Sequence, residues 1–382
     1  MRAGAPRTGA FLYPWDVTGD PAAPGRLAAL GLDRITLAAA YHSTRALTPR
    51  HPRHRIVTAG HAAVLYPPDP ARWRGRALAP YPAGDWAPGD AFGAAADALA
   101  DTGLALHSWV VLAHNSRLGA EHPETSVVNA YGDAYPWAPC IGQDAVRAFL
   151  TDLAAEAAVR PGAAGTELES CGWYGLAHLH AHDKTAGVPL DAGAQYLMSL
   201  CFCPSCREGY GKRGADPDEL AAAVRAALEP VWRGESAAPL PAPLADAALA
   251  WRLAAARTLQ EAAVAAVRAA APPGYRVLLH ADPVPYHCGA NAGTDPAQVL
   301  AVADGVVTPA PHVAAFAAHA RVGTVVAANL TVVGGMGGSP GTLAADARRA
   351  ADQGATELSL YHAGLASDAD LAEVREALAG LR

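Results

Sequence analysis

Short apolar runs alternate with amphipathic segments along most of the chain. Eight of these runs are nearly continuous in apolar residues, which is typical of parallel strands that are covered on both faces. Gly and Pro residues bound most of them, as expected where strands give way to turns. The pattern predicts strands at residues 10–17, 34–42, 104–115, 165–173, 275–282, 305–309, 324–332 and 356–362.

Segments with helical periodicity separate the predicted strands. They are expected at residues 24–31, 92–102, 143–159, 244–271, 296–303, 311–320, 340–353 and 367–380. Eight strands that alternate with helices over 382 residues predict an α/β fold of the (β/α)8 TIM-barrel type. A doubly wound open sheet is the main alternative. It is weakened because residues 14–17, Pro-Trp-Asp-Val, replace the glycine fingerprint that follows the first strand of that fold.

Two long segments interrupt the alternation. Residues 43–91 are rich in Pro and Gly, and within them residues 55–66 predict a hairpin laid over one end of the fold. Residues 174–242 form an insertion after the fourth strand, with helical pieces near 190–200 and 217–233. Since no internal repeat or linker separates a second unit, we expect one barrel domain over residues 1–382 that carries the insertion 174–242.

Composition excludes several classes of partner. The net charge is −7, with acidic and basic residues mixed along the chain, so no basic surface for nucleic acid is predicted. No segment has the length and apolarity of a membrane span, and residues 1–9 lack the apolar centre of a secretory signal. We therefore expect a cytoplasmic protein with no nucleic-acid or membrane partner, and the sequence leaves a homo-oligomer open.

The fourth predicted strand is unusual because it carries two acids. Glu167 and Glu169 are two residues apart, so on a strand they share one face while Leu168 takes the other. Carboxylates on a covered face are costly unless they are paired, hydrogen-bonded or functional. Two interpretations stay open for Glu167, namely a buried pair with an Arg or His and a catalytic role beside Glu169.

Polar side chains also follow the other predicted strands. Active sites of (β/α)8 barrels are built at the carboxyl ends of the strands, so these side chains are candidates for a site. Aromatic faces together with Asp, Asn, Glu and His side chains suit the binding of sugars. The candidates for substrate binding are Trp15, Asp16, Tyr41, His114, Asn115, His178, His182, His280, Asn329 and Tyr361.

Glycoside cleavage uses two carboxylates, one protonated and one ionised. Glu169 is the predicted general acid because it lies nearer the strand end than Glu167. Asp282 is the predicted nucleophile or base, with Asp16 as the alternative. Both also have structural interpretations, Asp16 as a loop cap and Asp282 as a turn former before Pro283.

The six cysteines cluster in the sequence, and no secretory signal favours disulfides. Cys201, Cys203 and Cys206 can converge on one Zn²⁺ where the chain turns at Pro204. Cys140 is the predicted fourth ligand, with Cys171, Cys288 or a histidine as alternatives. Such a site is closed and structural, and it would hold the insertion against the neighbouring loop. Reduced, metal-free thiols are the other interpretation.

These motifs resemble known proteins. Cys-x-Cys-x-x-Cys after the fourth strand, with a Cys after the third, resembles the zinc site of glycoside hydrolase family 42 β-galactosidases. The stretches 129–137, 167–170, 178–184 and 199–206 resemble a group of uncharacterised barrel proteins that are labelled glycoside hydrolases. The resemblance covers residues 105–210 well and implies a (β/α)8 barrel with carbohydrate substrates.

The chain also departs from the pattern of family 42. Those enzymes resemble a larger clan with an acid/base Glu after an Asn on strand four and a nucleophilic Glu on strand seven. Here Leu168 precedes Glu169, and residues 328–330 on strand seven are Ala-Asn-Leu. Only the acid/base role is therefore implied, for Glu169, and the nucleophile of the clan has no counterpart.

Three functions follow from these observations. The first is a glycoside hydrolase that cleaves a small glycoside or oligosaccharide. The second is a metal-dependent sugar isomerase or epimerase, with an ion held by Glu169, Asp282, His280 and His178. The third is a carbohydrate-binding barrel without catalysis, because strand seven lacks a carboxylate.

Overall fold

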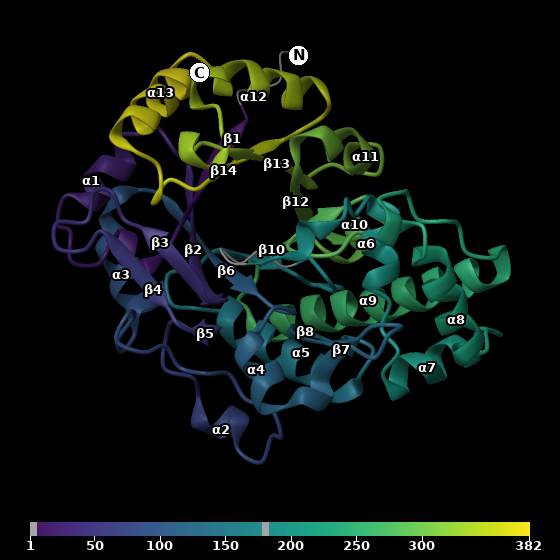
Figure 1. Ribbon diagram of the computed structural model, residues 1–382. Helices are drawn as coiled ribbons and strands as arrows, with labels where there is room; N and C mark the ends of the chain where they lie inside the picture. Colours follow the sequence, from purple (N-terminus) through teal and green to yellow (C-terminus); the bar gives the residue numbers. More distant parts are fainter. Residues whose placement is uncertain (1–5, 178–182) are drawn as a thin grey trace.

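The computed structural model describes residues 6–177 and 183–382, and in this part of the chain eight parallel strands form a closed barrel (Figure 1). Strand β1 pairs with β2 on one side and with β14 on the other, which closes the sheet. The (β/α)8 prediction is thus confirmed. The barrel strands are β1 (Arg7–Leu12), β2 (Arg34–Tyr41), β6 (Ala105–Val111), β9 (Gly165–Glu169), β10 (Arg276–Asp282), β12 (Gly305–Pro309), β13 (Val325–Thr331) and β14 (Glu357–Tyr361).

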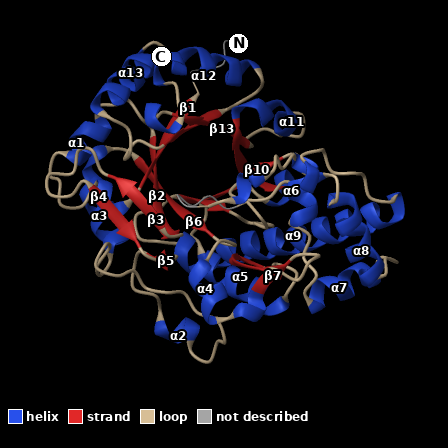
Figure 2. Ribbon diagram, viewed as in Figure 1, coloured by secondary structure: helices blue, strands red, loops and turns tan. Residues whose placement is uncertain are grey.

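Helices surround the barrel (Figure 2). α9 is the longest of those described, with 29 residues, and it packs beside α5 on the outside of the strands. A large apolar core fills the space between the strands and these helices. The surrounding helices are α1 (Ala23–Ala28), α3 (Ala91–Leu99), α5 (Asp144–Ala158), α9 (Ala242–Ala270), α10 (Pro296–Val302), α11 (Val313–Ala317), α12 (Leu343–Asp352) and α13 (Asp368–Ala379).

Several strands end earlier than the apolar pattern indicates. β1 ends at Leu12 because Pro14 has no N–H for the ladder and begins a short 3-10 helix, Pro14–Asp16. β9 ends at Glu169 because the next residue, Ser170, has a positive φ of 53° and is therefore not extended. Apolar residues beyond these ends, such as Tyr13 and Trp173, are nevertheless buried.

The prediction that residues 55–66 pair with each other as a hairpin is wrong. β4 (Ile56–Ala59) instead pairs antiparallel with β3 (Thr44–Leu47), and β5 (Ala63–Val64) pairs antiparallel with β2. The β2–β6 register shifts between Ala38 and Ala40, next to the residues of β2 that pair with β5. The rest of the excursion includes helix α2 (Pro70–Trp73). The β3–β4 hairpin lies at the mouth of the barrel (Figure 1).

The loops after β6 and β9 lie side by side (Figure 1). A backbone bond from Phe202 to Val128 joins them. The first loop contains α4 (Ser116–Glu121), β7 (Ser126–Val128) and β8 (Ala134–Pro139). The second contains α6 (Ala192–Met198), α7 (Pro204–Gly211) and α8 (Pro217–Leu228). Helix α7 packs closely on α9, since a Cβ at Gly209 would lie 2.4 Å from the indole of Trp251.

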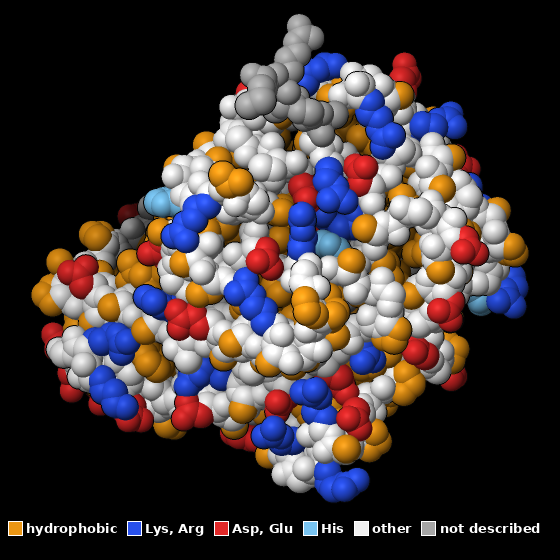
Figure 3. Space-filling view, turned by 180° about the vertical axis from the view of Figure 1, so that it is seen from behind, with side chains coloured by type: hydrophobic (Ala, Val, Ile, Leu, Met, Phe, Trp, Pro, Cys, Tyr) orange, Lys and Arg blue, Asp and Glu red, His pale blue; other side chains and the backbone are white. Residues whose placement is uncertain are grey.

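The barrel interior has an apolar layer in its middle and a charged layer nearer the amino ends of the strands. The apolar layer includes Phe11, Trp109, Leu278, Val307 and Ala327. This layer separates the charged groups below from the open end at the carboxyl ends of the strands. Seen from behind, the surface carries acidic and basic side chains intermixed (Figure 3). No helix among the described residues is long and apolar enough to cross a membrane.

The charged layer is an ion-pair network centred on Arg34. Its guanidinium lies 3.2 Å from Glu167 and also contacts Glu357 of β14. Thr36 donates a hydrogen bond of 2.7 Å to Glu167. Burial acts to raise the pKa of Glu167, but His280 and Arg34 together lower it from 4.5 to about 2. The ionised Glu167 therefore stabilises the fold above pH 4.5, and this contribution is lost as the pH falls towards 2.

Replacing Arg34 with Met should strongly destabilise the barrel, because Glu167 and Glu357 would stay buried without their counter-charge. We expect a loss of roughly 3–5 kcal/mol in the free energy of unfolding at pH 7. Chemical denaturation measures this loss, with the exposed Arg74→Met as the matched control. A variant as stable as the wild type would contradict the role of Arg34.

Candidate functional site

A large cavity opens at the carboxyl ends of the barrel strands. Its volume is about 1710 Å³, which is large enough for an oligosaccharide. Its walls come from the β3–β4 hairpin, from the loops after β6, β9, β10 and β13, and from residues at or just beyond the ends of β1, β2 and β14. The aromatic and imidazole side chains of the wall are Tyr13, Tyr41, His42, His114, Tyr174, His287 and Tyr361.

The aromatic rings of this wall pack against one another. Tyr13 meets Tyr41 edge to face at 5.0 Å, and Tyr174 stacks on His114 with ring centroids 4.0 Å apart. Tyr41, His114 and Tyr361 thus line the cavity, in the position predicted for strand-end residues. The sequence analysis missed Tyr13 and Tyr174. Tyr13 stands beside Pro14, and a strand ending before that proline would have placed its ring at the mouth.

Three of the cavity tyrosines gather near Glu169, which itself does not line the cavity. Burial raises the pKa of Tyr13, Tyr41 and Tyr361 above 10.0, and the charge of Glu169 adds to the rise in each case. Their hydroxyl groups therefore remain protonated at neutral pH. A protonated phenol can donate a hydrogen bond to a ligand oxygen and accept one in return.

Glu169 ends β9 with its side chain on the inner face of the barrel. It is 7% exposed and accepts a hydrogen bond of 2.8 Å from the indole N–H of Trp109. The imidazole of His280 lies between the two acids of β9, with Nε2 3.4 Å from Glu167 and Nδ1 4.0 Å from Glu169. Glu167 is fully buried in the ion-pair network below, whereas Glu169 lies near the tyrosines of the cavity.

Asp282 and Asp16 do not line the cavity. Asp282 is 3% exposed, accepts a hydrogen bond from the backbone N–H of Val284 and lies within 4 Å of two histidines. One oxygen of Asp282 is 3.6 Å from His312 Nε2 and 3.8 Å from His287 Nδ1. Among the described residues of the cavity wall there is no Asp or Glu.

Asp16 anchors the loop that follows β1. It accepts a hydrogen bond of 2.8 Å from the backbone N–H of Tyr13, and His362 lies 4.0 Å away. Burial raises its pKa to about 7, against the opposing effects of that hydrogen bond and of Arg50. Trp15 beside it is buried and stacks on Tyr13. These two residues thus support Tyr13 from behind.

The remaining candidates have mixed positions. Asn115 accepts a hydrogen bond from the backbone of Leu118, so its side chain caps helix α4. Asn329 and His280 lie at inner strand ends outside the cavity wall, and the amide oxygen of Asn329 is buried without a partner. His178 and His182 lie outside the described residues.

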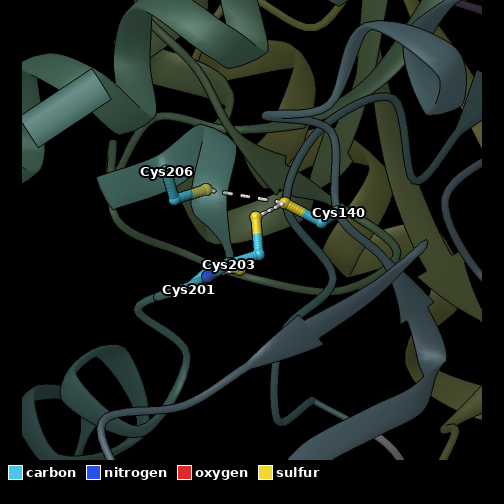
Figure 4. A group of neighbouring side chains, drawn as sticks. All are labelled: Cys140, Cys201, Cys203 and Cys206. Carbon is cyan, nitrogen blue, oxygen red and sulfur yellow. Dashed lines mark hydrogen bonds between the residues drawn. The ribbon is translucent and has the colours of Figure 1, made fainter. Parts of the chain in front are cut away.

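Four cysteines form a compact buried cluster beside the barrel (Figure 4). The sulfur of Cys140 lies 3.6 Å from that of Cys203 and 3.5 Å from that of Cys206, and the four sulfurs lie within 4.8 Å of one another. All are free of disulfides. Sulfurs bound tetrahedrally to a metal at about 2.3 Å would lie roughly 3.8 Å apart, so these four could hold a metal ion.

Backbone groups support this cluster. The N–H groups of Val128 and Cys203 lie 3.4 and 3.5 Å from the sulfur of Cys201, as donors to a thiolate would. The choice of Cys140 over Cys171, Cys288 or a histidine agrees with this geometry. Among the described residues, no other group of three or more His, Cys, Asp or Glu side chains converges in this way.

Comparisons with known proteins identify the fold but no family. No family model matches the sequence, and no curated protein matches it. The glycoside hydrolase domain of PgaB from Bordetella bronchiseptica is 14% identical with a TM-score of 0.60, over 98% of this chain and 99% of that domain. Alpha-L-fucosidase isoenzyme 2 from Paenibacillus thiaminolyticus is 12% identical with a TM-score of 0.59, over 100% of this chain.

A GH42 β-galactosidase from G. stearothermophilus is also similar, at 12% identity and a TM-score of 0.58 over 100% of this chain. The chain spans 49% of the fucosidase and 57% of this galactosidase. At such low identity these likenesses show a shared barrel fold. These structural neighbours are glycoside hydrolases, and no family model or sequence relative confirms the resemblance to family 42.

The buried phenol of Tyr41 should stay protonated at pH 10, where half of an ordinary tyrosine is ionised. We therefore expect Tyr41→Phe and the wild type to show the same phenolate absorbance up to that pH. Ultraviolet titration of both proteins measures this, with circular dichroism to confirm that they remain folded. A deficit of about half a phenolate in the variant at pH 10 would contradict the burial of Tyr41.

Proposed function

We propose that this protein is a glycoside hydrolase that cleaves a small glycoside or oligosaccharide in the barrel cavity, with Glu169 as the proton donor. The observation that carries the proposal is the position of Glu169. Its carboxyl group ends a barrel strand on the inner face, is held by the indole of Trp109 and lies beside three cavity tyrosines. This is where barrel enzymes place reacting groups.

The cavity wall supports a carbohydrate ligand. Protonated Tyr41 and Tyr361 offer hydroxyl groups to the hydroxyls of a sugar, and the rings of Tyr174 and His114 offer apolar faces. The barrel shared with a fucosidase and with β-galactosidases agrees with this class of ligand, although the likeness concerns the fold.

Asp282 remains our proposal for the second carboxylate. The oxygen of Asp282 that lies near His312 and His287 would have to move away from these histidines and into the cavity to act on a sugar. The absence of Asp and Glu from the described part of the cavity wall favours a second candidate function, a carbohydrate-binding barrel without hydrolysis. A metal-dependent isomerase has less support, because the described ligand atoms of Glu169, Asp282 and His280 do not converge.

We also propose that Cys140, Cys201, Cys203 and Cys206 hold a structural Zn²⁺. Four thiolates fill the tetrahedral coordination of zinc, so such an ion has no open position for substrate or water. Its role would be to fasten the insertion after β9 to the loop after β6.

Replacing Glu169 with Gln tests the catalytic role. The amide keeps the shape of the side chain but cannot donate the proton, so turnover should fall about 10²–10⁴-fold. A screen of chromogenic glycosides measures hydrolysis, and calorimetry with the matching free sugar measures binding. The exposed Glu124→Gln is the control.

The outcomes separate the two candidate functions. Hydrolysis that survives in Glu169→Gln would refute Glu169 as the acid. Sugar binding with no hydrolysis in the wild type would favour the carbohydrate-binding barrel.

Metal analysis tests the cysteine site. The purified wild type should contain about one zinc per chain, since four thiolates make one site. Cys206→Ser should lose the metal and unfold at a lower temperature, whereas the control Cys288→Ser should keep the metal. A metal-free wild type whose stability a chelator leaves unchanged would contradict the proposal.

A further inference from the structure

Arg252 of helix α9 is buried without a carboxylate partner. Its side chain is 1% exposed and lies between the rings of Trp173 and Tyr196, at 5.0 and 5.3 Å. One guanidinium nitrogen donates a hydrogen bond of 3.0 Å to the carbonyl of Ser199. No described Asp or Glu forms an ion pair with it, and residues 1–5 and 178–182 contain neither acid.

An unpaired charge in this position is costly. Arginine does not lose its proton in proteins, so burial cannot be relieved by neutralisation. Cation–π contacts with Trp173 and Tyr196 compensate for this cost only in part. A group that carries negative charge is therefore expected next to the guanidinium.

Cys288 occupies that place. Its sulfur accepts a hydrogen bond of 2.9 Å from Nη2 of Arg252, and a longer contact of 3.7 Å joins the sulfur to the carbonyl of Tyr286, the acceptor that a neutral thiol would use. Cys288 is partly exposed and belongs to the wall of the cavity. Gly175 faces it with a positive φ of 60°, and a Cβ there would approach the sulfur to 3.2 Å.

We propose that Cys288 is an ionised thiolate paired with Arg252, and that it forms a reactive site in the cavity wall for soft electrophiles such as low-molecular-weight disulfides. The site is separate from Glu169 and does not depend on the proposed hydrolase activity. The thiolate is the nucleophilic form of cysteine, and neighbouring Arg side chains favour it.

The other groups around Cys288 agree with one negative charge at this point. Tyr196 of α6, Tyr135 of β8 and the adjacent His287 surround it, and none of them is an acid that could replace it. Burial opposes the charge of Arg252, yet Cys288 and Tyr196 raise its pKa. Burial together with lesser effects, Cys288 among them, raises the pKa of Tyr135 to about 12.

The remaining cysteines are not equivalent to Cys288. Cys171 is 1% exposed, and burial raises its pKa to about 12. The other four have sulfurs in mutual contact in the buried cluster. Cys288 is therefore the cysteine that an electrophile in the cavity would meet.

The reaction with a disulfide is an exchange. The thiolate sulfur of Cys288 attacks one sulfur of the disulfide, a new S–S bond forms and the original S–S bond breaks. The displaced thiolate leaves with the electron pair and takes a proton from water. An excess of a monothiol reverses the exchange.

Alkylation by iodoacetamide tests the ionisation directly. The thiolate forms a C–S bond, the C–I bond breaks and iodide leaves, so the rate follows the thiolate fraction. A thiol with an ordinary pKa of about 8.5 reacts on the order of 100-fold slower at pH 6 than at pH 8.5. For Cys288 in the wild type we expect less than about a 3-fold difference, measured by mass spectrometry of its peptide.

Arg252→Met is the matching variant, with the exposed Arg257→Met on the same helix as control. We expect the steep pH dependence to return in Arg252→Met alone. A roughly 100-fold fall in the wild type, or no alkylation of Cys288 at either pH, would overturn the proposal. The wild-type profile decides the question even if Arg252→Met fails to fold.

Discussion

The barrel depends on the neutralisation of a carboxylate inside it. Glu167 is fully buried on β9, and its charge is balanced by Arg34 of β2. The same guanidinium reaches Glu357 of β14, although β1 lies between β2 and β14 in the sheet. Gly9 of β1 makes this possible, because a Cβ there would lie 3.0 Å from the guanidinium. One arginine thus links the strands on both sides of the point where the barrel closes.

This network separates the two acids of β9. Glu167 is surrounded by Arg34, Thr36 and His280, so its negative charge is well compensated and its role is structural. Glu169, two residues later, has the indole of Trp109 as its hydrogen-bond donor and tyrosines as its other neighbours. The same strand therefore supplies a fixed charge to the interior and a carboxyl group near the cavity.

The sequence predicted the parts of this structure that depend on local pattern. Apolar runs located the strands, strand alternation placed Glu167 and Glu169 on one face, and cysteine spacing located the cluster. Cys140 was also placed beside the distant cysteines, but the sequence did not predict most contacts between distant segments. For example, β4 pairs with β3 and not with another part of residues 55–66. The apolar pattern does not show which of these partners is preferred.

In the candidate site, too, the sequence did not predict which groups the polar side chains would contact. The sequence left Asp282 open as a nucleophile or as a turn former before Pro283. Its hydrogen bond from Val284 agrees with the turn former, and His312, thirty residues later, lies beside it. Asn115 looked like a ligand for a sugar, and its side chain caps α4. Tyr174 was missed because it reaches the cavity through a loop rather than from a strand end. Each of these outcomes depends on which groups lie next to the side chain in the folded protein, and the sequence alone does not show this.

The cysteine cluster has a consequence for the strand that carries Glu169. Cys140 and Cys206 are 66 residues apart, and β9 lies between them in the chain. A metal that joins the two would close this segment into a loop, and by analogy with a disulfide such a closure lowers the entropy of the unfolded chain by an amount worth about 4 kcal/mol. Metal binding and the folded state of β9 would then be thermodynamically linked, so that metal depletion would destabilise this strand from outside the cavity.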